Sequence, residues 1–280
     1  MIRKTFSNGV EVYGFQTGSV QVKQEHFQYS GGGLLRFPRI LLGAQWAPVM
    51  PIWVWLIKTP TGNYLVDTGE STSFYDPHHF PSKEENFVNR RILRIEIERE
   101  HEIDAQLQSV GLRPKDIDAV LMTHLHVDHT DGIKYFPHSE FLVSAVEMGK
   151  PFGVPLSSFP SWFIPRQIKY VPSEKPFPGE YKLSDCLSIV STPGHTFGHQ
   201  SVMLEVDECH ILFAGDTTFN EAQLLHHQLG GICVSLQGAR GTLSNIRSFS
   251  RTTRLIYLPS HDPKSGERLL NYDFIRANKA

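Results

Sequence analysis

The chain of 280 residues is 40% hydrophobic and 20% charged, which is typical of a globular protein and excludes a disordered or fibrous one. Its 27 basic and 29 acidic side chains give a formal net charge of −2, so there is no basic excess for general binding to nucleic acid. Three scattered cysteines favour a reducing compartment. Neither a signal peptide nor an apolar run of about 18 residues is evident, so we expect a cytoplasmic protein without stable membrane insertion.

Two β-hairpins are predicted, and helix-compatible residues followed by a buried strand come after each. The hairpins span residues 51–67 and 199–216, where β-rich runs flank polar turns. The apolar runs 119–122 and 255–258 predict the buried strands. The chain therefore consists of two diverged halves, and we predict an α/β fold with a four-layer αββα sandwich, in which two sheets pack face to face with helices outside.

Two segments do not fit this repeat. We predict a single domain over residues 1–280, with an apolar loop insertion near 26–50 and an insertion rich in proline and aromatic residues near 148–180. Long segments without a regular pattern are often lids, binding loops or interface arms. The alternative is that they only cover the edges of the core, and the sequence leaves both interpretations open.

A dense group of potential metal ligands follows the predicted strand 119–122. Residues 123–129 read Thr-His-Leu-His-Val-Asp-His. His124 and His126 lie two residues apart and can point the same way, whereas Asp128 and His129 must turn to a neighbouring position. Two adjacent ions, each bound by one pair, are a simpler arrangement than four ligands on one ion. Such a cluster at a strand end indicates a metal site rather than a polar turn.

Three more candidate ligands stand at predicted strand ends. His195 follows a Pro-Gly turn that exposes its imidazole, Asp216 ends the second hairpin, and His261 follows the last strand. Each is a weak signal alone, but together they supply the remaining ligands for two metals. Nine other histidines lack this setting, and among them His199 is the best candidate for orienting a ligand.

These motifs resemble those of the metallo-β-lactamase superfamily. The resemblance rests on His-Leu-His-Val-Asp-His at 124–129, Thr-Pro-Gly-His at 192–195, Gly-Asp at 215–216, Ser-His-Asp at 260–262 and Val-Asp-Thr-Gly at 66–69. Within the superfamily, residues 51–56 and 192–201 and the chain length are similar to those of the N-acyl-homoserine lactone lactonases. The resemblance implies a metal-dependent hydrolase that opens the lactone ring of these quorum-sensing signals (quorum quenching).

The resemblance also implies a site with two divalent ions. Carried over to this sequence, the first ion is held by His124, His126 and His195, the second by Asp128, His129 and His261, and both by Asp216 and a bridging hydroxide. Without a thiolate ligand, zinc is our first expectation, and iron, cobalt and manganese also suit such a site. Asp67 would orient a ligand histidine, unless it is only a turn former.

The mechanism that the resemblance implies uses the hydroxide as nucleophile on the lactone carbonyl. Asp128 is then the catalytic residue that passes a proton to the leaving alkoxide. Related lactonases carry a tyrosine three residues after the bridging aspartate, where this sequence has Phe219. Phenylalanine cannot donate a hydrogen bond, so that role passes to a metal, to Thr217 or Thr218, or to a histidine such as His226 or His227.

The expected substrate is a small molecule with an apolar acyl chain. Segment 31–50 carries many large apolar side chains, which must be buried in a pocket wall or against a second subunit of a homodimer. We therefore assign Trp46 and Met50 to substrate binding, together with Val127 and Phe219 from the resemblance.

Two other classes of function remain open. Another dinuclear hydrolase of the superfamily would act on aryl esters, thioesters or phosphotriesters. A glutathione thioester would need a cationic clamp, and no Lys/Arg cluster is obvious in the sequence. A β-lactamase would normally be exported. A metal-stabilised regulator or scaffold is disfavoured because structural zinc sites usually close with thiolates.

Overall fold

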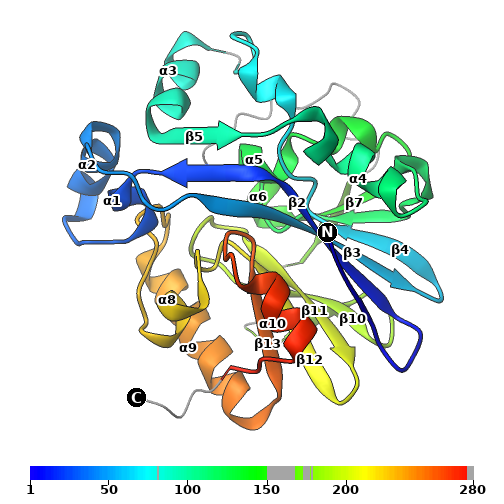
Figure 1. The fold of residues 1–280 in the computed structure, drawn as a ribbon. Helices are drawn as coiled ribbons and strands as arrows, with labels where there is room; N and C mark the ends of the chain where they lie inside the picture. Colours follow the sequence, from blue (N-terminus) through cyan, green and yellow to red (C-terminus); the bar gives the residue numbers. More distant parts are fainter. Residues whose placement is uncertain (81, 150–167, 173–176, 178, 276–280) are drawn as a thin grey trace.

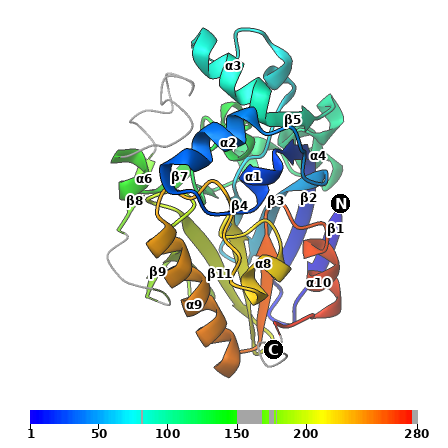
Figure 2. The same cartoon turned by 90° about the vertical axis from the view of Figure 1, so that its left-hand side faces the viewer.

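Two mixed β-sheets pack face to face, and helices cover their outer faces (Figures 1 and 2). The computed structural model describes residues 1–280 except 81, 150–167, 173–176, 178 and 276–280. The packing of the two sheets between layers of helices (Figures 1 and 2) confirms the predicted αββα sandwich. Most of the insertion predicted near 148–180 lies outside the described residues. No described helix is long and apolar enough to cross a membrane.

The first sheet has eight strands. In spatial order they are β1 (Ile2–Thr5), β2 (Glu11–Val22), β3 (Met50–Thr59), β4 (Gly62–Val66), β6 (Ala119–Leu121), β7 (Glu140–Ser144) and β8 (Ile168–Val171), with β5 (Leu93–Glu96) paired to β2. Strands β1 to β4 are antiparallel, and β4, β6, β7 and β8 run parallel. The carboxyl ends of β4 and β6 thus meet at one edge.

The second sheet has five strands. Their spatial order is β13 (Leu255–Pro259), β12 (Cys209–Gly215), β11 (Gln200–Val206), β10 (Leu187–Ser191) and β9 (Glu180–Lys182). All neighbours are antiparallel except β12 and β13. Strands β10, β12 and β13 therefore run in the same direction, and the connections that follow them leave at one edge.

Helices surround both sheets. They are α1 (Gln24–Phe27), α2 (Arg36–Leu42), α3 (Lys83–Ile92), α4 (Ile103–Ser109), α5 (Val127–Thr130), α6 (Ala145–Gly149), α8 (Glu221–Leu225), α9 (Leu236–Thr252) and α10 (Ser265–Asn271). Short 3₁₀ turns are η1 (Gly33–Leu35), η2 (Thr72–Tyr75), η3 (Arg99–His101), η4 (Pro114–Asp116) and η5 (Ile133–Tyr135).

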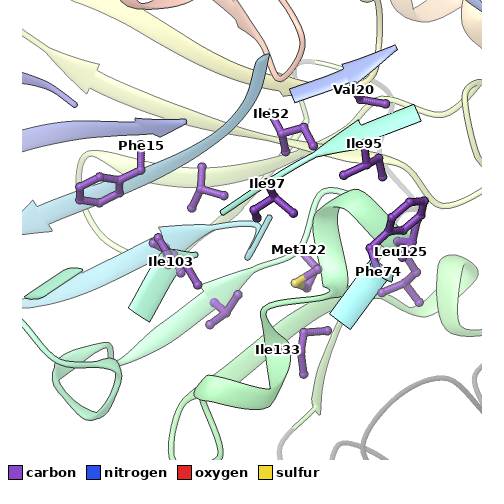
Figure 3. Close-up of a cluster of buried hydrophobic side chains, with 14 of the residues drawn as sticks. Phe15, Val20, Ile52, Phe74, Ile95, Ile97, Ile103, Met122, Leu125 and Ile133 are labelled. Atoms are coloured by element: carbon purple, nitrogen blue, oxygen red, sulfur yellow. The ribbon is translucent and has the colours of Figure 1, made fainter. Parts of the chain in front are cut away.

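Alternation along the strands divides the interior into three cores. On β3, Trp55 and Ile57 face the second sheet, while Val54 and Leu56 face the helices outside the first sheet, because successive side chains of a strand point to opposite faces. Figure 3 shows part of the outer core, where Met122 and Ile133 meet side chains from β2, β3 and β5. The third core lies between the second sheet and α9. Both sheets are thus covered on both faces.

Both predicted hairpins and both buried strands are confirmed. Strands β3 and β4 form the first hairpin, and β11 and β12 form the second. In each half the predicted buried strand pairs in parallel with the second hairpin strand, β6 with β4 and β13 with β12. Two elements differ from the sequence prediction. The apolar segment near 26–50 contains the helix α2, and strand β5 interrupts the helix-compatible region after the first hairpin.

Candidate metal centre

The candidate ligands meet at the edge where the strands of both sheets end. The motif at 124–129 follows β6, His195 follows β10, Asp216 follows β12, and His261 follows β13. Carboxyl ends of strands are the usual place for functional residues in α/β folds, since connecting loops converge there. The structure brings all seven predicted ligands together.

The chain turns into a helix within the motif itself. Helix α5 begins at Val127, and the 3₁₀ turn η5 follows Gly132. His126 is still extended, so it points with His124, whereas Asp128 and His129 lie on the first helical turn. This change of backbone conformation within the motif directs its four side chains to two positions.

The first position is formed by His124, His126 and His195, which we call the histidine triad. Its metal-facing nitrogens converge, with His124 Nε2 lying 3.0 Å and His195 Nε2 lying 2.9 Å from His126 Nδ1. All three donors lie within 4.8 Å of one another. That spacing suits three nitrogen ligands around one ion.

The second position is formed by Asp128, His129 and His261, which we call the carboxylate triad. Asp128 Oδ2 lies 3.3 Å from His261 Nε2 and 3.8 Å from His129 Nε2. Asp216 stands between the triads. Its Oδ2 lies 3.4 Å from His195 Nε2, and its Oδ1 lies 3.3 Å from His261 Nε2. One carboxylate thus reaches both positions.

The buried polar atoms of the site fit a pair of divalent cations. His129 Nε2 and Asp216 Oδ1 are enclosed and make no hydrogen bond, although buried polar atoms nearly always have a partner. The donor set is imidazole nitrogen and carboxylate oxygen only, which suits zinc and its first-row neighbours. The seven side chains thus have the positions and the donor atoms to hold divalent metal.

The outer nitrogen of four ligand histidines is held by a hydrogen-bond partner. His124 Nδ1 pairs with Thr123 Oγ1 at 3.0 Å, His129 Nδ1 with Asp67 Oδ2 at 2.8 Å, His195 Nδ1 with the Ile232 carbonyl at 3.0 Å, and His261 Nδ1 with the Pro51 carbonyl at 2.9 Å. Such partners fix the tautomer and the orientation of a metal-binding imidazole.

Asp67 makes three of the hydrogen bonds that fix the motif. Besides His129 Nδ1, its carboxylate accepts from the Thr123 amide at 2.7 Å and from the Thr123 hydroxyl at 2.8 Å. Asp67 has φ +60°, a left-handed conformation that is uncommon for residues other than glycine. The turn after β4 therefore carries backbone strain where its carboxylate holds a candidate ligand. Its role in metal binding stays a prediction.

Two further buried residues tie the ligand loops together. His199 Nε2 accepts from the Asp216 amide at 3.0 Å, as expected for a residue that orients a ligand loop. Glu147, which sequence reasoning missed, accepts from the Leu125 amide at 3.3 Å and from the Gly198 amide at 3.0 Å. It thereby links the motif after β6 to the loop of His195. Nothing near Glu147 in the sequence marks it, since its partners lie far along the chain.

The two triads differ in their electrostatics. Burial, with the charges of neighbouring histidines, lowers the pKa of His124 and of His195 well below the usual range. Burial alone would also lower the pKa of His261, but Asp216 and Asp128 raise it to about 10. The same carboxylates overcome burial at His129 and raise its pKa well above the usual range.

A cavity with apolar walls opens onto the candidate ligands. Its lining consists of Val20, Val22, His26, Asn89, Ile92, Leu93, His126, Val127, Asp128, His195, Asp216, Phe219, Ile232 and His261. The apolar side chains come from β2, α3, β5, α5 and two loops. Such a site, apolar with a few convergent polar groups, is typical of a small-molecule pocket. The alternation of Val20 and Val22 on β2 is the only sequence signal that could have suggested a wall.

The predicted substrate-binding residues divide into two pairs. Val127 and Phe219 line the cavity, whereas Trp46 and Met50 do not. Met50 is buried in the core outside the first sheet. Trp46 pairs with Lys23 in an isolated β-bridge and lines a separate hollow. Substrate contact by Trp46 or Met50 therefore stays a prediction without support from the cavity.

Phe219 lies beside a histidine that sequence reasoning left aside. Its ring centroid lies 5.8 Å from that of His26 and 5.7 Å from that of His261. His26 is 8% exposed, and its Nδ1 is enclosed without a hydrogen-bond partner. By contrast, His226 and His227 are exposed. A histidine from α1, outside both triads, thus lies beside the position of the expected tyrosine.

Thr217 and Thr218 are engaged elsewhere. Both hydroxyls are hydrogen-bonded to the hydroxyl of Tyr257. Neither threonine lines the cavity.

Two N-acyl homoserine lactonases are similar to this chain in sequence. An N-acyl homoserine lactonase of Bacillus cereus is 28% identical over 159 residues. The aligned region covers 57% of this chain and 60% of that relative's length. The N-acyl homoserine lactonase AttM of Azorhizobium caulinodans is 25% identical over 275 residues, 91% of this chain and 94% of that protein.

The fold and the family are shown independently. A solved structure of an N-acyl homoserine lactone hydrolase, with the product N-hexanoyl-L-homoserine at its catalytic metal centre, has a TM-score of 0.73 at 18% identity and covers 94% of this chain and 96% of that one. The family model of the metallo-beta-lactamase superfamily matches residues 47–261, from β3 to the last candidate ligand. With the sandwich and both triads in place, the chain belongs to the metallo-β-lactamase superfamily.

Proposed function

We propose that the protein is a dinuclear metal hydrolase that opens the lactone ring of N-acyl-homoserine lactones. The observation that carries the proposal is the position of Asp216, whose carboxylate reaches both triads at the base of an apolar cavity. When bound, two divalent ions supply a nucleophilic hydroxide and polarise the ester carbonyl. The lactonases found among the relatives support the substrate class.

The cavity suits the two ends of such a substrate. Val20, Val22, Ile92 and Leu93 offer an apolar wall for an acyl chain, and each methylene buried there contributes about 0.8 kcal/mol. Both triads contribute side chains to the same lining, so the polar ring would face them. We assign the acyl chain to this wall rather than to segment 31–50.

His26 is our candidate for the polar role that tyrosine has in related lactonases. Burial, with the nearby charge of His126, lowers the pKa of His26 to about 3. The imidazole is therefore neutral at ordinary pH, and a neutral imidazole can donate one hydrogen bond and accept another. Its unpartnered Nδ1 in the cavity wall would find a partner on the substrate.

Asp128 is our candidate for proton transfer. It lines the cavity beside His261. Burial alone would raise the pKa of Asp128, but the charge of His129 and the hydrogen bond from His261 lower it. The carboxylate is thus ionised and can accept a proton from the attacking water and return it to the leaving alkoxide.

A hydrolysis screen tests the proposal. The metal-loaded protein would be assayed with homoserine lactones of several chain lengths beside an aryl ester, a thioester, a phosphotriester and a β-lactam. We expect the highest kcat/KM for a lactone, with values that rise with chain length. A higher kcat/KM for any other class of substrate would contradict the lactonase proposal. The protein would then be a dinuclear hydrolase that acts on that class.

A metal analysis tests the dinuclear part separately. We expect two metal equivalents in the wild type and a loss at both positions in Asp216→Ala, because one carboxylate serves both. A maximum of one metal equivalent per chain after reconstitution would contradict the dinuclear site.

A further inference from the structure

The α2 and α3 helices present a surface that combines exposed apolar side chains with cations. Its apolar members are Leu35, Phe37, Leu42, Phe87 and Val88. Its cations are Lys83, Arg90, Arg91 and Arg94, which are exposed, and Lys23, which is only 6% exposed but lines the same hollow. We call this surface the α2–α3 face. The two helices pack against each other and lie on the same side of the molecule in both views (Figures 1 and 2).

The apolar part of the face is unusual for a surface exposed to water. Leu42 is 72% exposed, and Leu35 and Phe87 are each 64% exposed. Five of the twelve large apolar side chains that are exposed among the described residues belong to this face. Single exposed apolar residues need no explanation, but a group of them marks a binding surface.

The cationic part surrounds a hollow next to these side chains. The hollow is lined by all five cations together with Trp46, Asn86 and Phe87. Lys23 Nζ and the Arg94 guanidinium carbon each lie 3.9 Å from the Trp46 ring centroid. Burial, with the charges of Arg91 and Arg94, lowers the pKa of Lys23, whose side chain is only 6% exposed. The cations are therefore close enough to repel one another.

These charges are not neutralised within the part of the chain that the structure describes. None of the five cations lies within 4.0 Å of a described carboxylate oxygen, although Glu84 and Glu85 lie in the first turn of α3 and Glu25 lies two residues after Lys23. An anionic partner would relieve the repulsion. An isologous dimer through this face would not, because it places the same cations on both sides.

We propose that the α2–α3 face docks the protein on the surface of a membrane that contains anionic phospholipid. The apolar side chains would enter the boundary between headgroups and acyl chains, as those of interfacial helices do. The half-buried Trp46 has the amphipathic ring that is favoured at this depth, and the cations would bind lipid phosphates. No segment crosses the bilayer in this arrangement.

Docking would place the catalytic cavity near the lipid surface. Asn89 and Ile92 of α3 line that cavity, and Val22, which also lines it, directly precedes Lys23. A substrate with an acyl chain partitions into lipid, so docking would bring the cavity to it. Only this consequence rests on the proposed function, since the docking itself requires no activity.

Flotation with sealed vesicles tests the proposal on the metal-loaded protein. We expect binding to equimolar phosphatidylcholine and phosphatidylglycerol, weakening as sodium chloride is raised, and little binding to phosphatidylcholine alone. Each basic residue near an anionic leaflet contributes about fivefold, so Arg91→Gln with Arg94→Gln should reduce partitioning by roughly 25-fold. Leu42→Ser with Phe87→Ser should reduce it as well.

The matched control is Arg240→Gln with Arg251→Gln, two exposed arginines on α9. It removes the same charge outside the face and should bind like the wild type. No binding to anionic vesicles, or equal loss in this control, would overturn the proposal. Sodium phosphate that displaces the protein better than sodium chloride of equal ionic strength would show a site for free phosphate instead.

Light scattering after size-exclusion chromatography tests whether a second copy of the chain occupies the α2–α3 face instead. A dimer that Leu42→Ser with Phe87→Ser dissociates, without vesicle binding by the wild type, would assign the face to a second copy of the chain and overturn the membrane proposal. Circular dichroism of each variant separates these outcomes from misfolding.

Discussion

The histidine triad and the carboxylate triad use the same imidazole group in opposite electrostatic settings. His124 and His195 have lowered pKa values because they are buried among other histidines. His129 and His261 are just as buried, but carboxylates beside them raise their pKa values. Burial alone therefore does not decide whether a buried histidine carries a proton. The nearest charge decides it.

This difference has a consequence for metal binding. Without an ion, the carboxylate triad keeps protons on its histidines, which pair with Asp128 and Asp216. An ion at this triad must displace those protons, whereas one at the histidine triad meets neutral imidazoles. The carboxylate triad also contains Asp128, the group we assign to proton transfer. We therefore expect the triads to respond differently to substitution and to pH.

The largest effect is expected for Asp128→Asn. Asparagine keeps an oxygen ligand but cannot carry a proton, so kcat should fall by about 10² to 10⁴ with a smaller change in KM. Steady-state kinetics beside elemental analysis would check this. Asp185→Asn, on an exposed carboxylate away from the cavity, is the matched control. Near wild-type kcat with full metal in Asp128→Asn would show that the proton passes elsewhere.

A pH series compares the triads directly. The raised pKa values of His129 and His261 mean that protons compete with the metal for the carboxylate triad at neutral pH. This competition disappears as pH rises through the folded-state pKa values, about 10 for His261. Each displaced proton changes the affinity by about tenfold per pH unit. The pKa values of His124 and His195 are lowered, so these histidines carry no proton above the usual pKa of histidine. The metal affinity of the histidine triad should therefore not change with pH in that range.

Chelator competition between neutral and mildly alkaline pH would measure both affinities. We expect the weaker metal equivalent to tighten steeply with pH and the stronger one to change little. Equal slopes for the two equivalents would mean that the triads do not differ in bound protons.

Asp67→Asn tests how the carboxylate triad is oriented. Asparagine tolerates the left-handed backbone at this position but removes the charge that accepts from His129 Nδ1. Loss of such a partner typically costs 10-fold to 100-fold in metal affinity. Isothermal titration with zinc should show the loss at one of two equivalents. An equal loss at both would assign Asp67 to the whole motif through Thr123.

The sequence predicted the metal centre more completely than the cavity. The motif at 124–129 is visible because four ligands are adjacent, and His195, Asp216 and His261 because each ends a predicted strand. The cavity walls have no such signal, since His26, Ile92 and Ile232 meet only through tertiary packing. The same holds for the cations of the α2–α3 face, where Lys23 and Arg91 line one hollow although 67 residues separate them in the sequence.

The smallest effect is expected at His26, which lies beside the triads without belonging to either. His26→Phe keeps a ring of similar shape next to Phe219 and removes both nitrogens. A hydrogen bond between neutral groups contributes about 0.5–1.5 kcal/mol, so kcat/KM for lactones should fall about tenfold at most, with unchanged metal content. His26→Asn, whose amide lies near the position of Nδ1, should recover part of the loss.

The same variant has a second readout that does not depend on substrate. Burial lowers the pKa of His26 to about 3, against about 6.5 in the unfolded chain. Between these values the unfolded chain binds one more proton, so this residue contributes stability above pH 6.5 that is lost as pH falls toward 3. The slope is about 1.4 kcal/mol per pH unit, and His26→Phe should remove it from denaturant unfolding curves. If His26→Phe removes the slope but leaves lactone kinetics unchanged, His26 is a buried packing residue and the substrate's polar partner lies within the triads themselves.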